Sequence, residues 1–194
     1  FTITSLGFAE KIVYRNKSKI HDDIYVTGNL GDSFLGLLIL ENKININKKL
    51  NNYFINQYYK PEIKYSLTDQ LNKFATSSID ISDGLISDLE KLNNKQKISY
   101  QLFFDKIPVS KNLNSVLNLK NLLKINLISK GDDYQVLFTS NLKNRNLIKK
   151  ISSTKKIKIT RIGKILNSKH KSSIIDRNGH KIKINNKGYH HAFD

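Results

Sequence analysis

The stretch Ser77-Ser78-Ile79-Asp80-Ile81-Ser82-Asp83-Gly84-Leu85 joins a predicted strand to a predicted helix. Ile79 and Ile81 alternate with polar residues, and this alternation indicates a half-buried strand over Ser78–Ile81. If the strand extends to Ser82, Asp80 and Ser82 project from the same face, because side chains alternate across a strand. The helix that follows is predicted over Asp83–Leu92, with its leucine and isoleucine side chains on one face.

An ordinary helix start explains part of this segment. Ser82 falls at the N-cap position and Asp83 in the first helical turn, where both residue types are common. That explanation leaves out Asp80, a carboxylate between two isoleucines. Two carboxylates and a hydroxyl at the end of a strand suit hard cations and phosphate oxygens, so we interpret the segment as a functional site.

Strand and helix patterns alternate through the rest of the chain, which predicts an α/β or α+β fold with helices packed on a mixed sheet. The asparagine- and lysine-rich Asn42–Asn52 is interpreted as a loop or helix end. The further strands are predicted at Asp23–Gly28, Ile98–Phe104, Tyr134–Thr139, near Ile165, and at Ser172–Asp176 and Lys181–Ile184; the further helices at Asp32–Leu40, Leu67–Thr76, Lys111–Leu119 and Leu142–Ile151.

Two other segments place acidic residues beside glycines. In Thr27-Gly28-Asn29-Leu30-Gly31-Asp32-Ser33, the glycines could turn backbone N–H groups toward an anion, but a plain strand-to-helix turn needs the same residues. In Lys130-Gly131-Asp132-Asp133-Tyr134, the adjacent carboxylates fit either a polar turn or a functional loop. Near the end, Gly188-Tyr189-His190-His191 offers an aromatic stacking surface; adjacent histidines point apart and make a poor metal pair.

The composition argues against several classes of protein. The net charge of +17 reflects 33 basic residues, of which 29 are Lys and only 4 are Arg, against 16 acidic ones; Asn and Ile are also abundant, as A/T-rich codons would produce. We therefore expect a solvated basic surface and no nucleic-acid partner. The chain has no cysteine, no long apolar run and no signal-peptide pattern, so we expect a cytoplasmic protein without a membrane partner. It begins with Phe1 and has no Met, which suggests part of a longer protein.

Taken in order, the motifs resemble the bacterial thiamine-monophosphate kinase family of the AIR-synthetase-like superfamily. Ile79-Asp80-Ile81-Ser82-Asp83-Gly84-Leu85 is typical of the whole superfamily and indicates the fold class. Gly131-Asp132-Asp133-Tyr134 and the aromatic-histidine tail point to the thiamine-phosphate branch. The resemblance also covers Thr2-Ile3-Thr4-Ser5-Leu6-Gly7, Arg15 and Tyr25-Val26-Thr27-Gly28-Asn29-Leu30-Gly31-Asp32.

The resemblance implies ATP- and magnesium-dependent phosphorylation of thiamine phosphate to thiamine diphosphate, with no residue acting covalently. It implies that Asp80 and Asp83 hold magnesium and that Ser82 contacts ATP. Arg15 would also bind ATP at its phosphates. The substrate would be held by Asp132 and by an aromatic residue, Tyr189.

The resemblance further implies that residues 1–20 end an N-terminal ATP- and metal-binding domain, including its last strand, and that residues 21–194 form the C-terminal AIR-synthetase-like domain. The full-length family member would be a homodimer, and this chain alone would be nearly inactive. His21 and Lys130 stand where the family has glycine, and Asp132 where it has glutamate. These departures leave two alternatives: another ATP-dependent enzyme of the superfamily, or an inactive remnant of a split gene.

Overall fold

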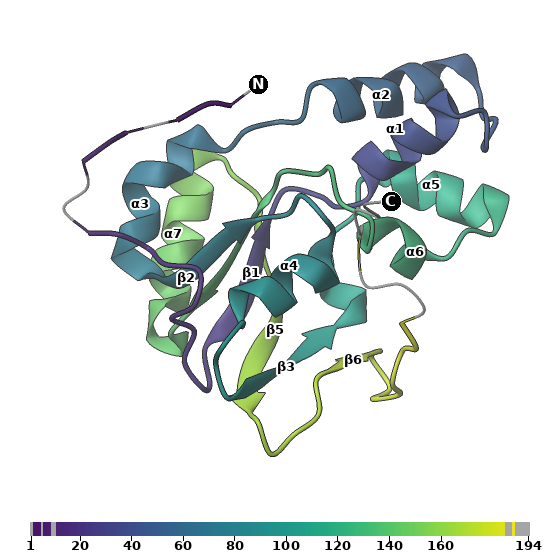
Figure 1. The fold of residues 1–194 in the computed structure, drawn as a ribbon. Coiled ribbons are helices and arrows are strands. Elements are labelled where there is room, and N and C mark those ends of the chain that lie inside the picture. Colours follow the sequence, from purple (N-terminus) through teal and green to yellow (C-terminus); the bar gives the residue numbers. More distant parts are fainter. Residues whose placement is uncertain (1, 5, 9–10, 185–187, 189–194) are drawn as a thin grey trace.

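A six-stranded sheet in the order β2-β4-β1-β5-β3-β6 forms the centre of the molecule (Figure 1). The structure, a computed structural model, describes residues 2–4, 6–8, 11–184 and 188. Neighbouring strands are antiparallel except β3 and β6, which are parallel. The mixed sheet with packed helices is therefore confirmed. Its strands are β1 (Asp23–Thr27), β2 (Ala75–Asp80), β3 (Ile98–Phe103), β4 (Val136–Ser140), β5 (Ile159–Asn167) and β6 (Ser173–Ile175).

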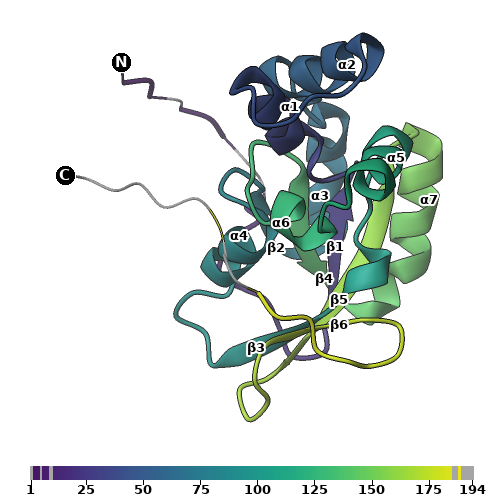
Figure 2. The same cartoon turned by 90° about the vertical axis from the view of Figure 1, so that its right-hand side faces the viewer.

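Helices cover both faces of the sheet (Figures 1 and 2). Helix α4 lies on one face, α3 and α7 lie on the other, and α1, α2, α5 and α6 gather beyond the end of β1. None of the helices in the described ranges is both long and apolar enough to cross a bilayer. Their bounds are α1 (Asp32–Leu40), α2 (Lys48–Tyr59), α3 (Thr68–Phe74), α4 (Leu85–Leu92), α5 (Lys111–Lys120), α6 (Lys124–Ile128) and α7 (Arg145–Lys155).

The alternation of strand residues divides the core between the two faces. In β1, Ile24 and Val26 pack on the α4 side, whereas Tyr25 packs on the α3 and α7 side. The Tyr25 ring stacks on Phe138 of β4, with 5.1 Å between ring centroids. Because both faces of β1 are buried, this strand is held rigidly at the centre of the sheet and fixes where the loop after it emerges.

A third apolar cluster joins α1 and α2 to α5 and α6. Helices α1 and α2 approach closely because α1 contains Gly36: a Cβ atom there would lie 2.2 Å from the carbonyl oxygen of Phe54. A glycine inside a helix is unfavourable by itself, so close helix packing compensates for it here. This packing presents the outer side of α1 to the loops that leave β2 and precede β4.

The stretch Asn42–Asn52 contains a loop and a helix end, as interpreted from the sequence. Helix α2 begins inside it, and the Asn47 side chain caps the helix by accepting from the Leu50 N–H at 3.0 Å. The strand predicted at Lys181–Ile184 was wrong, because only Lys181 forms a bridge there, to Ile175. The lysine–isoleucine alternation is only four residues long, and a local pattern of this length does not supply a partner strand. The N-terminal strand expected within residues 1–20 stays a prediction.

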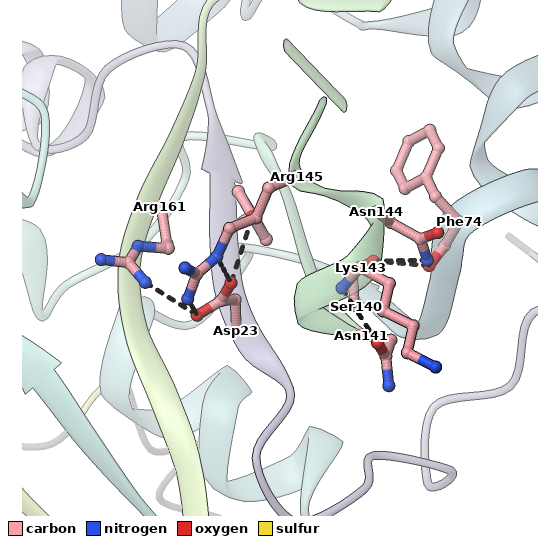
Figure 3. A network of polar contacts seen from close by, with 9 residues as sticks. Asp23, Phe74, Ser140, Asn141, Lys143, Asn144, Arg145 and Arg161 are labelled. Carbon is pink, nitrogen blue, oxygen red and sulfur yellow. Dashed lines mark hydrogen bonds and ion pairs between the residues drawn. The ribbon is translucent and has the colours of Figure 1, made fainter. Parts of the chain in front are cut away.

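A buried carboxylate ties three elements together on the α7 side of the sheet (Figure 3). Asp23 of β1 accepts from Nε and Nη2 of Arg145 at 2.6 and 2.9 Å, and from Nη1 of Arg161 at 3.0 Å. Burial alone would raise the pKa of Asp23, but the hydrogen bonds from the two guanidinium groups outweigh it and hold the pKa below its usual value. The strand entry from His21 is strained, since His21 has a φ of 72°.

Candidate functional site

Asp80 lies at the end of β2, next to the apolar core but outside it. It is the last residue of the strand and pairs with Val136 of β4. The flanking Ile79 and Ile81 are buried, whereas Asp80 is exposed. Because the strand ends at Asp80, Ser82 lies in the following turn, so the expectation that a continuous strand places both side chains on one face was wrong.

The start of α4 also differs from the prediction. The helix begins at Leu85, not at Asp83, and Gly84 occupies the N-cap position with a φ of 120° and no side-chain cap. Ser82 is therefore not the N-cap. Ser82 and Asp83 instead form the turn between β2 and α4, where their side chains are free of a capping role.

Asp88 holds this turn in place. Its Oδ2 atom accepts from the backbone N–H groups of Ser82 and Asp83, both at 2.9 Å, and of Gly84 at 3.1 Å. The Asp88 side chain is completely buried. One carboxylate in the first turn of the helix therefore satisfies the N–H groups of the turn that leads into it.

Sequence reasoning missed Asp88, although a signal for it exists. Asp88 is three residues after Leu85 and four before Leu92, so it lies on the apolar face of α4. A carboxylate on a buried face needs hydrogen-bond donors to compensate for the loss of water. The nearest unsatisfied donors in sequence are the N–H groups that precede the helix, which is where the structure places its partners.

The loop before β4 packs directly against the Ser82–Gly84 turn. A Cβ atom on Gly131 would lie 2.1 Å from the carbonyl oxygen of Ser82, and one on Gly84 would lie 2.2 Å from that of Ser129. Both glycines have positive φ, and the Asp132 N–H donates to the Ser82 carbonyl at 3.0 Å. Two acidic segments that are distant in the sequence therefore form one backbone unit.

A cavity of about 590 Å³ opens beside this unit. One wall carries Asp83, Asp132 and Tyr134, and the other carries Phe34 and Leu38 of α1. Burial, followed by repulsion from Asp83, raises the pKa of Asp132. Such a cavity suits a ligand that has an apolar ring and a positive charge, or that carries anionic groups together with a cation.

In the glycine-containing loop after β1, a backbone N–H group already binds a carboxylate of the protein itself. The Gly31 N–H donates to both carboxyl oxygens of Asp133, at 3.0 and 2.8 Å. Of the two interpretations of this loop, the structural turn is therefore favoured over an external anion site. Asp133 is buried, and this burial raises its pKa from 3.8 to about 8 against the hydrogen bond from Gly31.

The raised pKa of Asp133 predicts a pH-dependent stability difference. Between pH 3.8 and about 8, the folded protein retains a proton that the unfolded chain releases, so the wild type loses stability as the pH rises. Asp133→Asn cannot titrate there. Urea unfolding across this range should show the variant gaining on the wild type as the pH rises. Asp69→Asn, at an exposed position of α3, is the control, and a pH-independent difference for Asp133→Asn would contradict the prediction.

The remaining two predicted site residues lie on the chain ends. Arg15 is exposed, and its segment runs beside β2, since the Ser78 N–H donates to the Tyr14 carbonyl at 3.1 Å. No described contact joins the Arg15 side chain to the cavity. Tyr189 lies outside the described residues. Its neighbour Gly188 packs beside the site: a Cβ atom there would lie 2.9 Å from the Asp83 carbonyl oxygen.

Several known proteins are similar in sequence to this chain, and those compared are thiamine-monophosphate kinases. No family model matches the chain. A thiamine-monophosphate kinase of Buchnera aphidicola subsp. Acyrthosiphon pisum is 35% identical over 193 residues, which is 98% of this chain and 59% of that protein. The chain thus spans little more than half the length of the curated relatives that it matches.

Solved structures show which fold the chain has. The thiamine-monophosphate kinase from Stenotrophomonas maltophilia superposes with a TM-score of 0.75 over 89% of this chain and 55% of that one, at 24% identity, which shows the fold. AaThiL complexed with AMPPCP and TMP superposes with a TM-score of 0.74 at 26% identity, over 92% of this chain and 54% of that one. The sheet and its helices are therefore those of these proteins.

Proposed function

The chain is homologous, over nearly its whole length, to somewhat more than half of a thiamine-monophosphate kinase, and on this premise we propose its function. As part of the complete enzyme, it would transfer the γ-phosphoryl group of ATP to thiamine phosphate and so produce thiamine diphosphate. The main structural support for this proposal is the cavity at which the Ser82–Gly84 turn and the Asp132 loop meet. The relative solved with AMPPCP and TMP, an ATP analogue and thiamine phosphate, supports this proposal.

The carboxylates at the end of β2 and in the following turn would balance the phosphate charge through a metal ion. We assign magnesium binding to Asp80 and Asp83, and nucleotide contact to Ser82 and Arg15. Magnesium supplies the charge neutralisation that allows one phosphate to approach another. The protein's contribution is then to position the two phosphates, so no covalent intermediate on a side chain is required.

The described residues fit magnesium in a specific way. Among residues 11–184, no group of three or more histidine, cysteine or acidic side chains is arranged to hold a metal ion. Magnesium commonly uses one or two carboxylates and completes its shell with water and substrate phosphates. Asp80 and Asp83 match that requirement, since both carboxylates border the same turn and neither is fully buried.

The other end of the cavity suits the organic part of the substrate. Thiamine phosphate carries a cationic thiazolium ring, which is attracted both by a carboxylate and by an aromatic face. We assign these contacts to Asp132 and Tyr189. Phe34 and Leu38 of α1 add apolar side chains to the lining of the same cavity, which suits an organic ring.

The proposed function also implies how the chain is divided between two domains of the complete enzyme. We propose that residues 1–20 belong with an ATP- and metal-binding domain and that residues 21–194 form the second domain. The complete protein would be a cytoplasmic homodimer that takes ATP and thiamine phosphate as substrates. The sheet, which begins at β1 (Asp23–Thr27), supports a boundary just before it.

The direct test is product formation. The chain is completed with the remaining portion found in its relatives and incubated with ATP, Mg²⁺ and thiamine phosphate, and thiamine diphosphate is followed by thiochrome fluorescence. We expect turnover in the completed protein and little or none in the 194-residue chain. No product from the completed, folded protein would exclude this function. ATP hydrolysis that responds to a different acceptor would favour another enzyme of the same fold.

A further inference from the structure

Lys91 bridges two carboxylates at the site. It lies on α4, three residues after Asp88, and its ammonium group donates to Oδ1 of Asp88 at 2.8 Å. The same ammonium group donates to Oδ2 of Asp83. A cation supplied by the protein therefore lies on one of the two carboxylates that we assign to magnesium.

The two carboxylates under Lys91 are not equivalent. The Asp88 side chain is 0% exposed, and its other oxygen holds the N–H groups of the 82–84 turn, so Asp88 cannot follow the ammonium group if it moves. Asp83 is 30% exposed and faces the cavity, and Lys91 is 43% exposed. The bond to Asp88 is thus an anchor, while the bond to Asp83 can be exchanged with solvent or with another cation.

We propose that Lys91 is an internal counter-ion that neutralises Asp83 while the metal site is empty and competes with the divalent cation for this carboxylate. The proposal rests on the magnesium role given to Asp83 above. An ammonium group and a divalent cation on the same oxygen repel each other, so binding of the metal requires Lys91 to leave Asp83. Lys91 then keeps its bond to Asp88, which confines the ammonium group to the rim of the site.

Competition of this kind has two consequences. The Ser82–Asp83 turn is ordered without metal, because Asp88 and Lys91 already satisfy its N–H groups and its charge. The bare cation binds weakly, because it must displace an ion pair. A cation that arrives with phosphate groups has an additional partner for the released ammonium group, since lysine is a good ligand for phosphate.

The test measures metal affinity directly. Free Mn²⁺ is quantified by electron paramagnetic resonance during titration of the 194-residue chain, and Mg²⁺ is added as a competitor. Lys91→Gln should bind Mn²⁺ about three- to tenfold more tightly than the wild type, the range expected for loss of a partly exposed ion pair. Lys91→Arg keeps the charge and should bind like the wild type. Lys97→Gln, an exposed position just after α4, should change affinity by less than about twofold and controls for net charge.

The outcomes separate this inference from the proposed function. Equal or weaker binding by Lys91→Gln, or an equal gain in Lys97→Gln, overturns the counter-ion role, and so does the absence of Mn²⁺ binding in every variant. Asp83→Asn should abolish the binding that Lys91→Gln strengthens. If Asp83→Asn binds like the wild type, the metal assignment of Asp83 is wrong, whether or not the completed protein makes thiamine diphosphate. Circular dichroism on each variant confirms that it is folded.

Discussion

Replacement of Asp83 by asparagine is expected to lower the turnover of the completed kinase at least about 100-fold, which is a typical effect of removing a group that stabilises transition-state charge. Asparagine keeps the size and one oxygen of the side chain but loses the charge that attracts a divalent cation. The backbone of the turn should remain in place, because Asp88 holds it. Thiochrome fluorescence measures the loss at ATP and Mg²⁺ concentrations that just saturate the wild type.

Two comparisons sharpen this prediction. Asp69→Asn makes the same chemical change at an exposed position on α3, outside the cavity, and should leave turnover within about twofold of the wild type. Excess Mg²⁺ should partly restore Asp83→Asn if the defect is metal affinity. Turnover that stays within about threefold of the wild type would remove Asp83 from the magnesium site.

Replacement of Asp88 by alanine should destabilise the fold by about 3–5 kcal/mol, because a buried acceptor is removed from several donors at once. The N–H groups of residues 82–84 and the ammonium group of Lys91 all lose their partner. Urea unfolding of the 194-residue chain measures the effect. The variant tests whether the turn depends on this carboxylate or is held by the surrounding sheet.

A matched surface residue provides the control. Asp176 accepts from the N–H groups of Asn178 and His180, at 2.8 and 2.9 Å, in the same manner but in an exposed turn. Asp176→Ala should therefore cost much less than Asp88→Ala, because water replaces the lost acceptor. Asp88→Asn keeps the shape and one acceptor oxygen, and about half of the loss is expected. A loss below about 1 kcal/mol in Asp88→Ala would show that the sheet alone maintains the turn.

The strand and helix around Asp80 could be predicted because their patterns are local. Ile79 and Ile81 are buried and Asp80 is exposed, as the alternation indicated, and the leucine face of α4 packs into the core. The cap was predicted wrongly for a physical reason. Ser82 is suited to cap a helix, but the buried Asp88 accepts the N–H groups of residues 82–84 and so holds them in a turn before the helix begins. Residue preference near a helix start does not reveal a competing acceptor one turn later.

The meeting of the two acidic loops could not be derived from local patterns. Asp132 and Ser82 are distant in the sequence, and their hydrogen bond depends on the pairing of β2 with β4. The family resemblance assigned both loops to one site, and the structure brings Ser82, Asp83 and Asp132 to one cavity. Asp80 and Arg15 are not among the residues that line this cavity, and Tyr189 lies outside the described residues. The roles of all the predicted site residues are proposals.

The close packing of the two loops at Gly84 and Gly131 has a consequence for how this protein tolerates mutation. At this point main chain meets main chain with no side chain between, so the spacing of the loops is set by peptide geometry. The chain is rich in lysine and asparagine, yet side-chain substitutions on the surface do not alter a distance that main-chain atoms determine. The spacing of the two loops is therefore protected from most changes in surface composition, and the mutations that reach it most directly are those that give either glycine a side chain or remove Asp88.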